Sequence, residues 1–419
     1  MESGSQSPLR LVYIVGTYPT ITTTFIDREI AVLRDLGVEI DVISIRSPDP
    51  DLLAQPEYRA IAADTTSLLP TTPARLIRAH LYFLLRRPGR YLSTCGYLLT
   101  RRHPSLRAWL KTLLHFGEAA LAADCARRSA PEHIHAHFLD RAATLALVVA
   151  RLLGCSYSIT AHANDIYVNP VLLGPKMANA AFVVTVSEYN RAHLLQAVPE
   201  ADGGNLAVLH PWVDTSSFVP SSGRRPGSTR RVLSVGRLVE KKGHQYLIEA
   251  CALLRDRGVE VECTVVGDGP LFAELQSKIR ALSLGDVVTL EGALPQSEVR
   301  RLAAESDLFV LACVVAADGD RDGIPVALAE AMAVGLPVVS TDVVGVSELV
   351  QSGTGVLAEP GDASSLADAI ESVLNGDMEM MGIAGREVVV AQFDLRAGVA
   401  RLLELFQETH RSTAEVARS

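Results

Sequence analysis

The sequence of 419 residues lacks CxxC cysteine pairs and a membrane-length apolar run, and its first residues do not have the pattern of a signal peptide. None of its six cysteines forms a CxxC pair, which indicates reduced core thiols of a cytosolic protein and argues against a disulfide framework. The most apolar stretch, AATLALVVA, ends at Arg151 and is too short to span a bilayer. The N-terminus MESGSQSPLR lacks the apolar region of a signal peptide. We therefore expect a cytoplasmic protein.

The sequence also has no excess of basic residues, and its formal net charge is −9. This charge argues against a nucleic-acid partner. The charge is unevenly distributed, however. Residues 71–130 contain eleven Lys and Arg but only Glu118 and Asp124 as acids, a local charge of about +9. Because Trp109 and many Leu, Tyr and Phe residues lie among these cations, the segment is predicted to contact the inner face of an anionic membrane or a lipid phosphate. A solvated basic face is the alternative.

The order of apolar patterns predicts two domains. A hydrophobic content of 48% is ample for globular cores, and the length favours two of them. Strand-length runs such as 9–16 and 38–45 alternate with helical spacing such as 24–37, which is typical of a parallel α/β sheet. Residues 211–230 are rich in Pro, Ser, Gly and Arg, as linkers are, and a second strand–helix series follows. We expect two successive doubly wound α/β domains with a boundary near residue 212.

The segment 317–339, ADGDRDGIPVALAEAMAVGLPVV, raises the question of a metal site. Its alternating aspartates begin like a calcium loop, but Ala329 stands where such a loop needs a bidentate Glu. Asp318 and Asp320 also form a D-x-D pair, a weak signal for Mg²⁺ holding a nucleotide diphosphate. We expect neither metal.

The same segment favours an anion site at the start of a helix. Pro325 suits the first helical position, Gly323 lets a ligand approach the backbone, and free N–H groups there attract phosphate. Asp322 could bind sugar hydroxyls, and the Glu330 carboxylate could accept two hydrogen bonds from a ribose diol. An Asp cap on a core helix is the alternative reading.

Two further loops follow strands in the same half of the chain. In SVGRLVEKKGHQYL (234–247), Arg237 and Lys242 are cations at the end of a strand, which suits a diphosphate, although a solvated basic turn is equally compatible. In VVGDGPL (265–271) the third glycine of a dinucleotide fingerprint is missing, which argues against an NAD-dependent dehydrogenase. This second loop is either a tight strand-to-helix turn or the lining of a nucleotide base.

The histidines of the first half gather on two strands. Alternation puts His133, His135 and His137 of HIHAHF on one face, which imitates a zinc cluster but lacks a carboxylate from elsewhere. His162 follows the next strand and could bind a sugar hydroxyl or stabilise a leaving group. A histidine with satisfied hydrogen bonds is the alternative at this position.

Together these motifs resemble those of the retaining glycosyltransferases of family 4. DGIPVALAEAMA (322–333) is similar to the family's Glu-x7-Glu stretch near the sugar donor, and GRLVEKKG (236–243) is similar to its G-R-L-x-x-x-K-G. Three shorter segments also match: VGDGP, VSELV with Glu348, and LAEPGD. The N-terminal segments YPTITTTFIDREI and AHANDIY resemble an exopolysaccharide branch of colanic-acid type.

The resemblance implies the GT-B fold, in which two Rossmann-like parallel-sheet domains face each other across a cleft. Residues 1–212 would bind the acceptor, residues 213–392 would bind the nucleotide-diphosphate sugar, and helices in 393–419 would pack back on the first domain. The implied reaction is a metal-independent transfer that retains the anomeric configuration. It needs no cofactor, and its sugar donor is expected to be UDP- or GDP-linked.

The resemblance also assigns roles to residues. Arg237 and Lys242 would hold the diphosphate and, with His162 and Asp322, form the catalytic group. The other residues expected to bind the sugar donor are Gly16, Gly236, Gly267, Asp268, Gly269, Gly323, Ile324, Pro325 and Glu330. The residues expected on the acceptor side are Thr22, Thr23, His137, Asn164 and Asp165.

Two departures from the family pattern leave alternatives open. Asp322 replaces the family's first Glu, and Thr23 stands where the branch has Glu. Asp322 leaves open a non-catalytic protein that binds sugar nucleotides, and Thr23 lies on the expected acceptor side. A sugar-nucleotide epimerase or phosphorylase on the same fold is a separate alternative. The acceptor is expected to be a glycan, a lipid-linked glycan or a small natural product.

Overall fold

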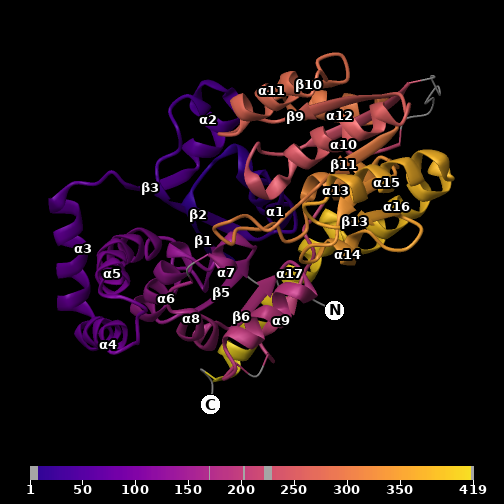
Figure 1. Ribbon diagram of the computed structural model, residues 1–419. Coiled ribbons are helices and arrows are strands. Elements are labelled where there is room, and N and C mark those ends of the chain that lie inside the picture. The colour runs from indigo at the N-terminus through magenta and orange to yellow at the C-terminus, as the bar shows by residue number, and fades with distance from the viewer. Residues whose placement is uncertain (1–7, 169, 202, 221–228, 417–419) are drawn as a thin grey trace, which may run out of the picture. The chain divides into compact units, whose positions relative to one another are not determined.

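The computed structural model describes residues 8–168, 170–201, 203–220 and 229–416 (Figure 1). They form two compact units that we treat separately. The first unit contains the described chain up to Thr185, Arg191–Leu209 and the chain from Val399 onward. The second unit contains Val186–Asn190 and His210–Gly398.

The first unit is built on a seven-stranded sheet in the order β3-β2-β1-β4-β5-β6-β7, and every pairing in it is parallel. Its strands are β1 (Arg10–Thr17), β2 (Glu39–Arg46), β3 (Thr65–Leu69), β4 (His133–His137), β5 (Ser156–Ala161), β6 (Phe182–Thr185) and β7 (Leu206–Val208). The strand order reverses between β1 and β4. Ligands of such sheets bind outside the carboxyl ends of the strands at this switch point.

The helices of this region begin and end at residues that favour helix termini. Ser105 caps α5 by accepting the N–H of Ala108 at 3.1 Å, and α6 ends at Gly154, whose φ of 77° is left-handed. The helices and 3₁₀ turns between the strands are η1 (Ile21–Thr23), α1 (Thr24–Asp35), η2 (Leu52–Ala54), α2 (Pro56–Ala63), α3 (Pro73–Arg86), α4 (Pro88–Leu99), α5 (Leu106–Ala126), α6 (Arg141–Leu153), α7 (Asn164–Tyr167), α8 (Leu173–Asn179) and α9 (Glu188–Ala197). Alanine-rich stretches of α5 and α6 pack together in the core.

The second unit repeats this architecture with a six-stranded parallel sheet in the order β10-β9-β8-β11-β12-β13. Its strands are β8 (Arg230–Val235), β9 (Val261–Val266), β10 (Val288–Gly292), β11 (Leu308–Leu311), β12 (Val338–Thr341) and β13 (Gly355–Ala358). Its helices are η3 (Glu240–Lys242), α10 (His244–Asp256), α11 (Phe272–Ala281), α12 (Gln296–Glu305), α13 (Val326–Ala333), α14 (Val346–Leu349), α15 (Ala363–Asn375) and α16 (Met378–Gln392). The switch point lies between β8 and β11. The predicted α/β class with two doubly wound sheets is confirmed.

The last helix, α17 (Leu395–Val416), begins in the second unit and continues in the first. Its Phe406 is 1% exposed and contacts the rings of His133, His135 and Phe182, with centroids 5.2–5.5 Å apart. The end of the chain therefore supplies part of the core beside the first sheet.

The basic segment 71–130 folds into α3, α4 and α5. All six cysteines of the chain are free. Within the described residues, no helix is both long enough and apolar enough to cross a membrane.

Candidate functional site

Two loops at the carboxyl ends of neighbouring strands flank the switch point of the second sheet. β8 ends at Val235, and the following loop carries Arg237 and the turn η3 with Lys241 and Lys242. β11 ends at Leu311, and the loop after it leads to α13. Because β8 and β11 pair directly, both loops start from the same edge of the sheet.

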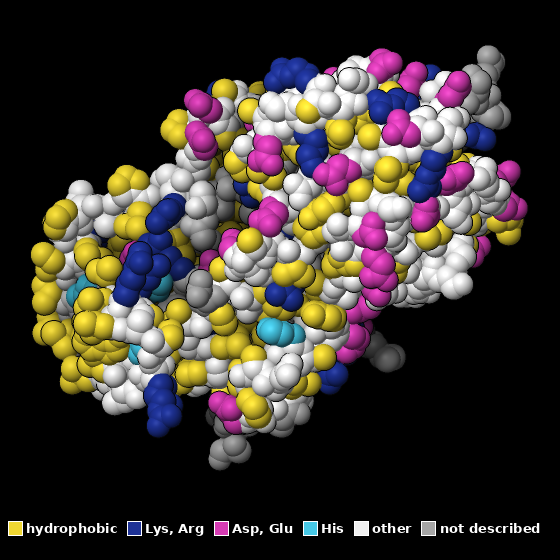
Figure 2. Space-filling view, viewed as in Figure 1, with side chains coloured by type: hydrophobic (Ala, Val, Ile, Leu, Met, Phe, Trp, Pro, Cys, Tyr) yellow, Lys and Arg dark blue, Asp and Glu magenta, His cyan; other side chains and the backbone are white. Residues whose placement is uncertain are grey.

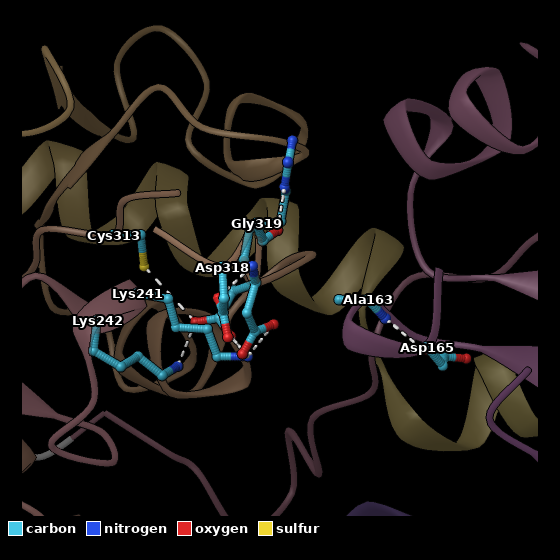
Figure 3. Close-up of polar contacts among 10 residues, drawn as sticks. Ala163, Asp165, Lys241, Lys242, Cys313, Asp318 and Gly319 are labelled. Atoms are coloured by element: carbon cyan, nitrogen blue, oxygen red, sulfur yellow. Dashed lines mark hydrogen bonds and ion pairs between the residues drawn. The ribbon is translucent and has the colours of Figure 1, made fainter. Parts of the chain in front are cut away.

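A cluster of opposite charges joins these loops (Figure 3). Lys242 Nζ lies 2.6 Å from Asp322 Oδ2, and Lys241 Nζ lies 3.3 Å from Asp322 Oδ1. These three side chains are only 15–18% exposed. Burial would raise the pKa of the Asp322 carboxyl, but the Lys242 and Lys241 ammoniums hold it below its ordinary value. Burial would lower the pKa of the Lys242 ammonium, but the Asp322 carboxylate raises it. Both groups are therefore ionised at neutral pH.

Glycines bring the loop backbones into direct contact. Gly267 has a φ of 146°, and a Cβ there would lie 1.9 Å from the carbonyl oxygen of Gly236. Gly243 has a φ of 64°, and a Cβ there would lie 1.7 Å from the carbonyl oxygen of Ala312. The Leu238 N–H also donates to the carbonyl oxygen of Asp268 at 3.0 Å. Glycine at positions 243 and 267 is therefore required for this close approach of the backbones. Of the other predicted residues, Gly236 lies against Lys242, and Asp268 and Gly269 lie against Leu238.

The start of α13 lies next to the cluster in sequence. The helix begins at Val326 and Pro325 is its N-cap, one position earlier than the first helical position that we predicted. Pro325 has an extended ψ of 120°, which is normal for an N-cap residue because its own backbone is not yet helical. Gly323, Ile324 and Pro325 are buried, and half-buried Glu330 accepts a hydrogen bond from Gln296 Nε2 at 3.3 Å. The first N–H groups of a helix have no partner inside the helix, so this end favours an anion.

The other acidic and nucleophilic groups of the loop are already engaged. Asp320 pairs with Lys241 at 3.0 Å, and exposed Asp318 accepts the backbone N–H of Asp320 at 2.9 Å. Asp320, one of the two D-x-D carboxylates, thus already has a lysine as its partner. Cys313 Sγ lies 3.9 Å from Asp322 Oδ2, and burial raises the pKa of its thiol to about 12, so the thiolate is not available as a nucleophile.

The histidines of the first unit lie on one face of β4, as the alternation predicts. His133 contacts the hydroxyls of Ser156 and Ser158, and His135 contacts those of Ser158 and Thr160, all at 2.7–3.1 Å. Burial lowers the pKa of both rings, to about 3 for His133. Among the described residues, the potential ligand atoms that lie within 4.8 Å of one another belong to Glu29, His135 and His137, a different group from the three histidines of the sequence motif.

A buried carboxylate fixes the backbone around His162. Asp165 accepts the N–H groups of Leu139, His162 and Ala163 at 2.6–3.1 Å, and thereby ties the carboxyl ends of β4 and β5. Figure 3 shows its contact with Ala163. Burial, and then Asp140, raises the pKa of Asp165 to about 6, although the N–H groups oppose the shift. Lys176, 1% exposed, donates to the carbonyl oxygens of Leu139 and Asp140, and burial lowers its pKa to about 8.

The remaining predicted residues of the first unit differ in exposure. Gly16 is half-buried at the end of β1, and among the described residues no atom lies within 4 Å of a Cβ built on it. Thr22 and Asn164 are exposed. Thr23 is buried, and its hydroxyl accepts the N–H of Thr20 at 2.9 Å and donates to the Thr20 carbonyl at 3.0 Å. The Thr23 hydroxyl is therefore committed to its own turn.

Sequence reasoning missed two groups, Glu29 and Lys241. Glu29 is 1% exposed, and its position among Ile26, Ile30 and Leu33 on the buried face of α1 was a signal that could have revealed it. Lys241 precedes Lys242 in the same turn and shares its partner.

Comparison with known proteins now decides the family. The sequence model of the family described as glycosyl transferases group 1 matches residues 218–388, which include both loops and α13. A GDP-mannose-dependent alpha-(1-6)-phosphatidylinositol monomannoside mannosyltransferase of Mycobacterium tuberculosis is 30% identical over 302 residues, which cover 67% of this chain and 78% of that protein. The chain belongs to the glycosyl transferases of group 1.

Two other proteins match nearly the whole length of this group 1 glycosyltransferase. The colanic acid biosynthesis glycosyltransferase WcaL of Salmonella typhimurium is 29% identical over 422 residues, 95% of this chain and 100% of that protein. The crystal structure of Anabaena HepE in complex with UDP has a TM-score of 0.69 at 17% identity and covers 96% of this chain and 100% of that one. The predicted family, GT-B fold and glycosyltransferase activity are confirmed.

Proposed function

We propose that this glycosyltransferase moves a sugar from a UDP- or GDP-linked sugar to a hydroxyl acceptor, with retained anomeric configuration and without a metal ion or cofactor. The cluster of Lys241, Lys242 and Asp322 carries the proposal, because it places two ammoniums beside the start of α13. A diphosphate leaving group is the main charge that develops during transfer, and fixed cations in a partly buried site stabilise it.

The charge cluster suggests an exchange of partners on binding. Lys242 pairs with Asp322 in the free protein, and the diphosphate would compete for that ammonium. Asp322 would then be released to accept hydrogen bonds from hydroxyls of the sugar. Arg237, which is exposed at the mouth of the loop, would add a second, forked contact to the phosphates, and Glu330 would accept from the ribose.

The relatives support a choice of sugar donors and acceptors. Anabaena HepE binds UDP, and the mycobacterial relative is GDP-mannose-dependent, so both nucleotides belong in the test. WcaL is named for colanic acid biosynthesis, and we propose an exopolysaccharide or a lipid-linked glycan as the acceptor class.

Thermal unfolding with UDP, GDP and their sugars, each with EDTA or Mg²⁺, tests this assignment. A ligand at a hundred times its Kd adds about 2.7 kcal/mol to the free energy of unfolding. We expect a shift with one diphosphate that EDTA leaves unchanged. A shift only with Mg²⁺ contradicts metal independence, and no shift with any nucleotide contradicts the proposed site. The anomeric ¹H coupling of the product then tests retention, and product formed without acceptor would favour an epimerase.

We further propose that α3, α4 and α5 dock this enzyme on an anionic membrane, where a lipid-linked acceptor would lie. Ile77, Leu81 and Leu85 follow one another at the helical spacing of four on α3, and all are 48–74% exposed. Leu106, Leu110 and Leu114 repeat this pattern on α5 at 50–72% exposure. Figure 2 shows hydrophobic side chains gathered with Lys and Arg over these helices. Apolar side chains flanked by cations are typical of surfaces that insert into an anionic headgroup layer.

Vesicle co-flotation tests the docking surface. We expect the protein to float with vesicles that contain phosphatidylglycerol and not with vesicles of phosphatidylcholine alone. Leu81→Glu with Leu85→Glu should abolish flotation. Leu36→Glu is the matched control, because Leu36 is 49% exposed in the same unit but lies at the end of α1. Equal loss in both variants, or no flotation of the wild type, would refute the docking surface.

A further inference from the structure

A chain of buried polar side chains in the first unit leads from the core to His162. Glu29 on α1 and His137 at the end of β4 are 1% and 0% exposed. Glu29 Oε1 lies 3.2 Å from His137 Nε2, and His137 Nδ1 lies 3.3 Å from His162 Nε2. Glu29 Oε1 also accepts the Tyr13 hydroxyl at 2.6 Å. These contacts lie at the β1/β4 switch point, where ligands of such sheets bind.

The hydrogen-bonding capacity of each group determines where the protons lie. A carboxylate only accepts, so the proton between Glu29 and His137 is on His137 Nε2. Nδ1 of a neutral His137 is then an acceptor, and the proton in its contact with His162 is on His162 Nε2. By the same reasoning, Nδ1 of a neutral His162 is an acceptor. Burial, and then the neighbouring His137, lowers the pKa of His162 well below its ordinary value, which agrees with a neutral ring.

The orientation of the His162 ring is fixed as well as its tautomer. The ring contacts both Phe25 and Phe138, with centroids 4.8 and 4.5 Å away. Phe138 has a φ of 76°, a left-handed conformation that is uncommon for a bulky residue and tends to persist at functional sites. Asp165 holds the backbone N–H of His162 at 3.1 Å. A side chain fixed in this way can present only one defined hydrogen-bonding pattern.

We propose that Glu29 and His137 are positioning residues that hold His162 in its Nε2-protonated tautomer, so that Nδ1 accepts a hydrogen bond from a hydroxyl of the transferred sugar. This inference rests on the proposed glycosyl transfer. It makes His162 a neutral acceptor that orients the sugar, and it leaves the stabilisation of the leaving diphosphate to Arg237 and Lys242. Of the two roles that the sequence left open for His162, binding a sugar hydroxyl and stabilising the leaving group, the proposal assigns it the first.

The same residues could instead hold a metal ion through Glu29, His135 and His137. Three observations favour the hydrogen-bonded chain. His137 Nε2 faces the carboxylate and needs its proton for that contact, and both ring nitrogens of His135 already meet hydroxyls of Ser158 and Thr160. The Glu29 oxygen is likewise already an acceptor for Tyr13.

Long-range ¹H–¹⁵N spectra of the full-length chain test the tautomer directly, with His162→Gln used to assign the signals. In the wild type we expect His162 to carry its proton on Nε2. Glu29→Gln keeps the shape of the side chain but adds an amide donor, so His137 can reverse and His162 should become a mixture of tautomers. In the same variant kcat should fall about tenfold, because the loss of one hydrogen bond has about this effect on the rate. The Kd of the nucleoside diphosphate should be unchanged.

His133→Gln is the matched control, because His133 is a buried histidine of the same strand that bonds to serines outside this chain of contacts. It should lower stability but leave the His162 tautomer and kcat unchanged. A wild-type His162 protonated on Nδ1, an unchanged tautomer in Glu29→Gln, or histidine signals that shift with Zn²⁺ or EDTA would overturn the proposal. Loss of all nucleotide binding would contradict the proposed function alone, since the tautomer is measured without ligand.

Discussion

Substitutions of Lys242 and of Asp322 should change nucleotide affinity in opposite directions. Lys242→Ala removes an ammonium that we expect to bind the diphosphate. A hydrogen bond to a charged group contributes about 1.5–3 kcal/mol, so the Kd of UDP or GDP should rise by about 10- to 100-fold. Asp322→Asn removes the anion that neutralises Lys242 at 2.6 Å in the free protein. Its Kd for the nucleoside diphosphate should therefore fall several-fold, while kcat for sugar transfer falls because the carboxylate no longer accepts from the sugar.

The stability of these variants follows from the same contacts. Removing one member of a fully buried pair costs about 3–5 kcal/mol. The cost in Lys242→Ala should be nearer 1–2 kcal/mol, because Asp322 is 15% exposed and keeps Lys241 at 3.3 Å. Since the Asp322 pKa is depressed, its contribution to stability is complete above the ordinary pKa of 3.8 and is lost as the pH falls through the lower folded-state value.

Titration calorimetry at two salt concentrations measures these affinities. Lys278→Ala is the matched control, because Lys278 pairs with Glu249 in the same unit and is 28% exposed. It should leave the Kd unchanged and cost less than about 1 kcal/mol of stability. If Lys242→Ala and Asp322→Asn weaken nucleotide binding equally, or if Lys278→Ala matches Lys242→Ala, the partner-exchange argument is refuted.

Three further predictions concern stability. Gly267→Ala should lower the free energy of unfolding by about 2–4 kcal/mol in urea, because its Cβ would overlap the Gly236 carbonyl at 1.9 Å; no loss would contradict the backbone packing of the loops. Phe406→Ala should cost about 3–5 kcal/mol by leaving a cavity beside His133 and Phe182, and a loss under 1 kcal/mol would mean that α17 does not complete this core. The folded-state pKa of Asp165 is about 6, above the ordinary 3.8, so the free energy of unfolding should rise as the pH falls through 6 and Asp165 becomes protonated. Urea unfolding at pH 7 and pH 5 should show this rise in the wild type and not in Asp165→Asn.

The fold could be predicted from the sequence because its signals are local. Strand-length apolar runs, helical spacing and glycine stops recur in order along the chain, and parallel pairing follows from that alternation. The loops 234–247 and 265–271 could be placed at the edge of a sheet because each follows an apolar run. The start of α13 was displaced by one residue, since Pro325 suits both the N-cap and the first helical position.

The parts of the candidate site that could not be predicted depend on contacts between distant segments. Lys242 and Asp322 are 80 positions apart, and nothing local shows that they pair. The Glu29 carboxylate meets His137 across 108 positions, so the alternating histidines resembled a cluster without a carboxylate. The role of Thr23 was also hidden, because its hydroxyl is used by Thr20 within one turn.

The position of Phe406 has a consequence for biosynthesis. The first sheet is complete in sequence once Val208 has been made, yet the ring that packs on His133 and His135 is nearly two hundred residues away in the chain. Domains generally fold in order as the chain leaves the ribosome. Here the first unit must wait with part of its core uncovered until the second has been synthesised. A fragment that stops after Leu209 would keep that surface exposed, so full-length chains are needed wherever the first unit is studied.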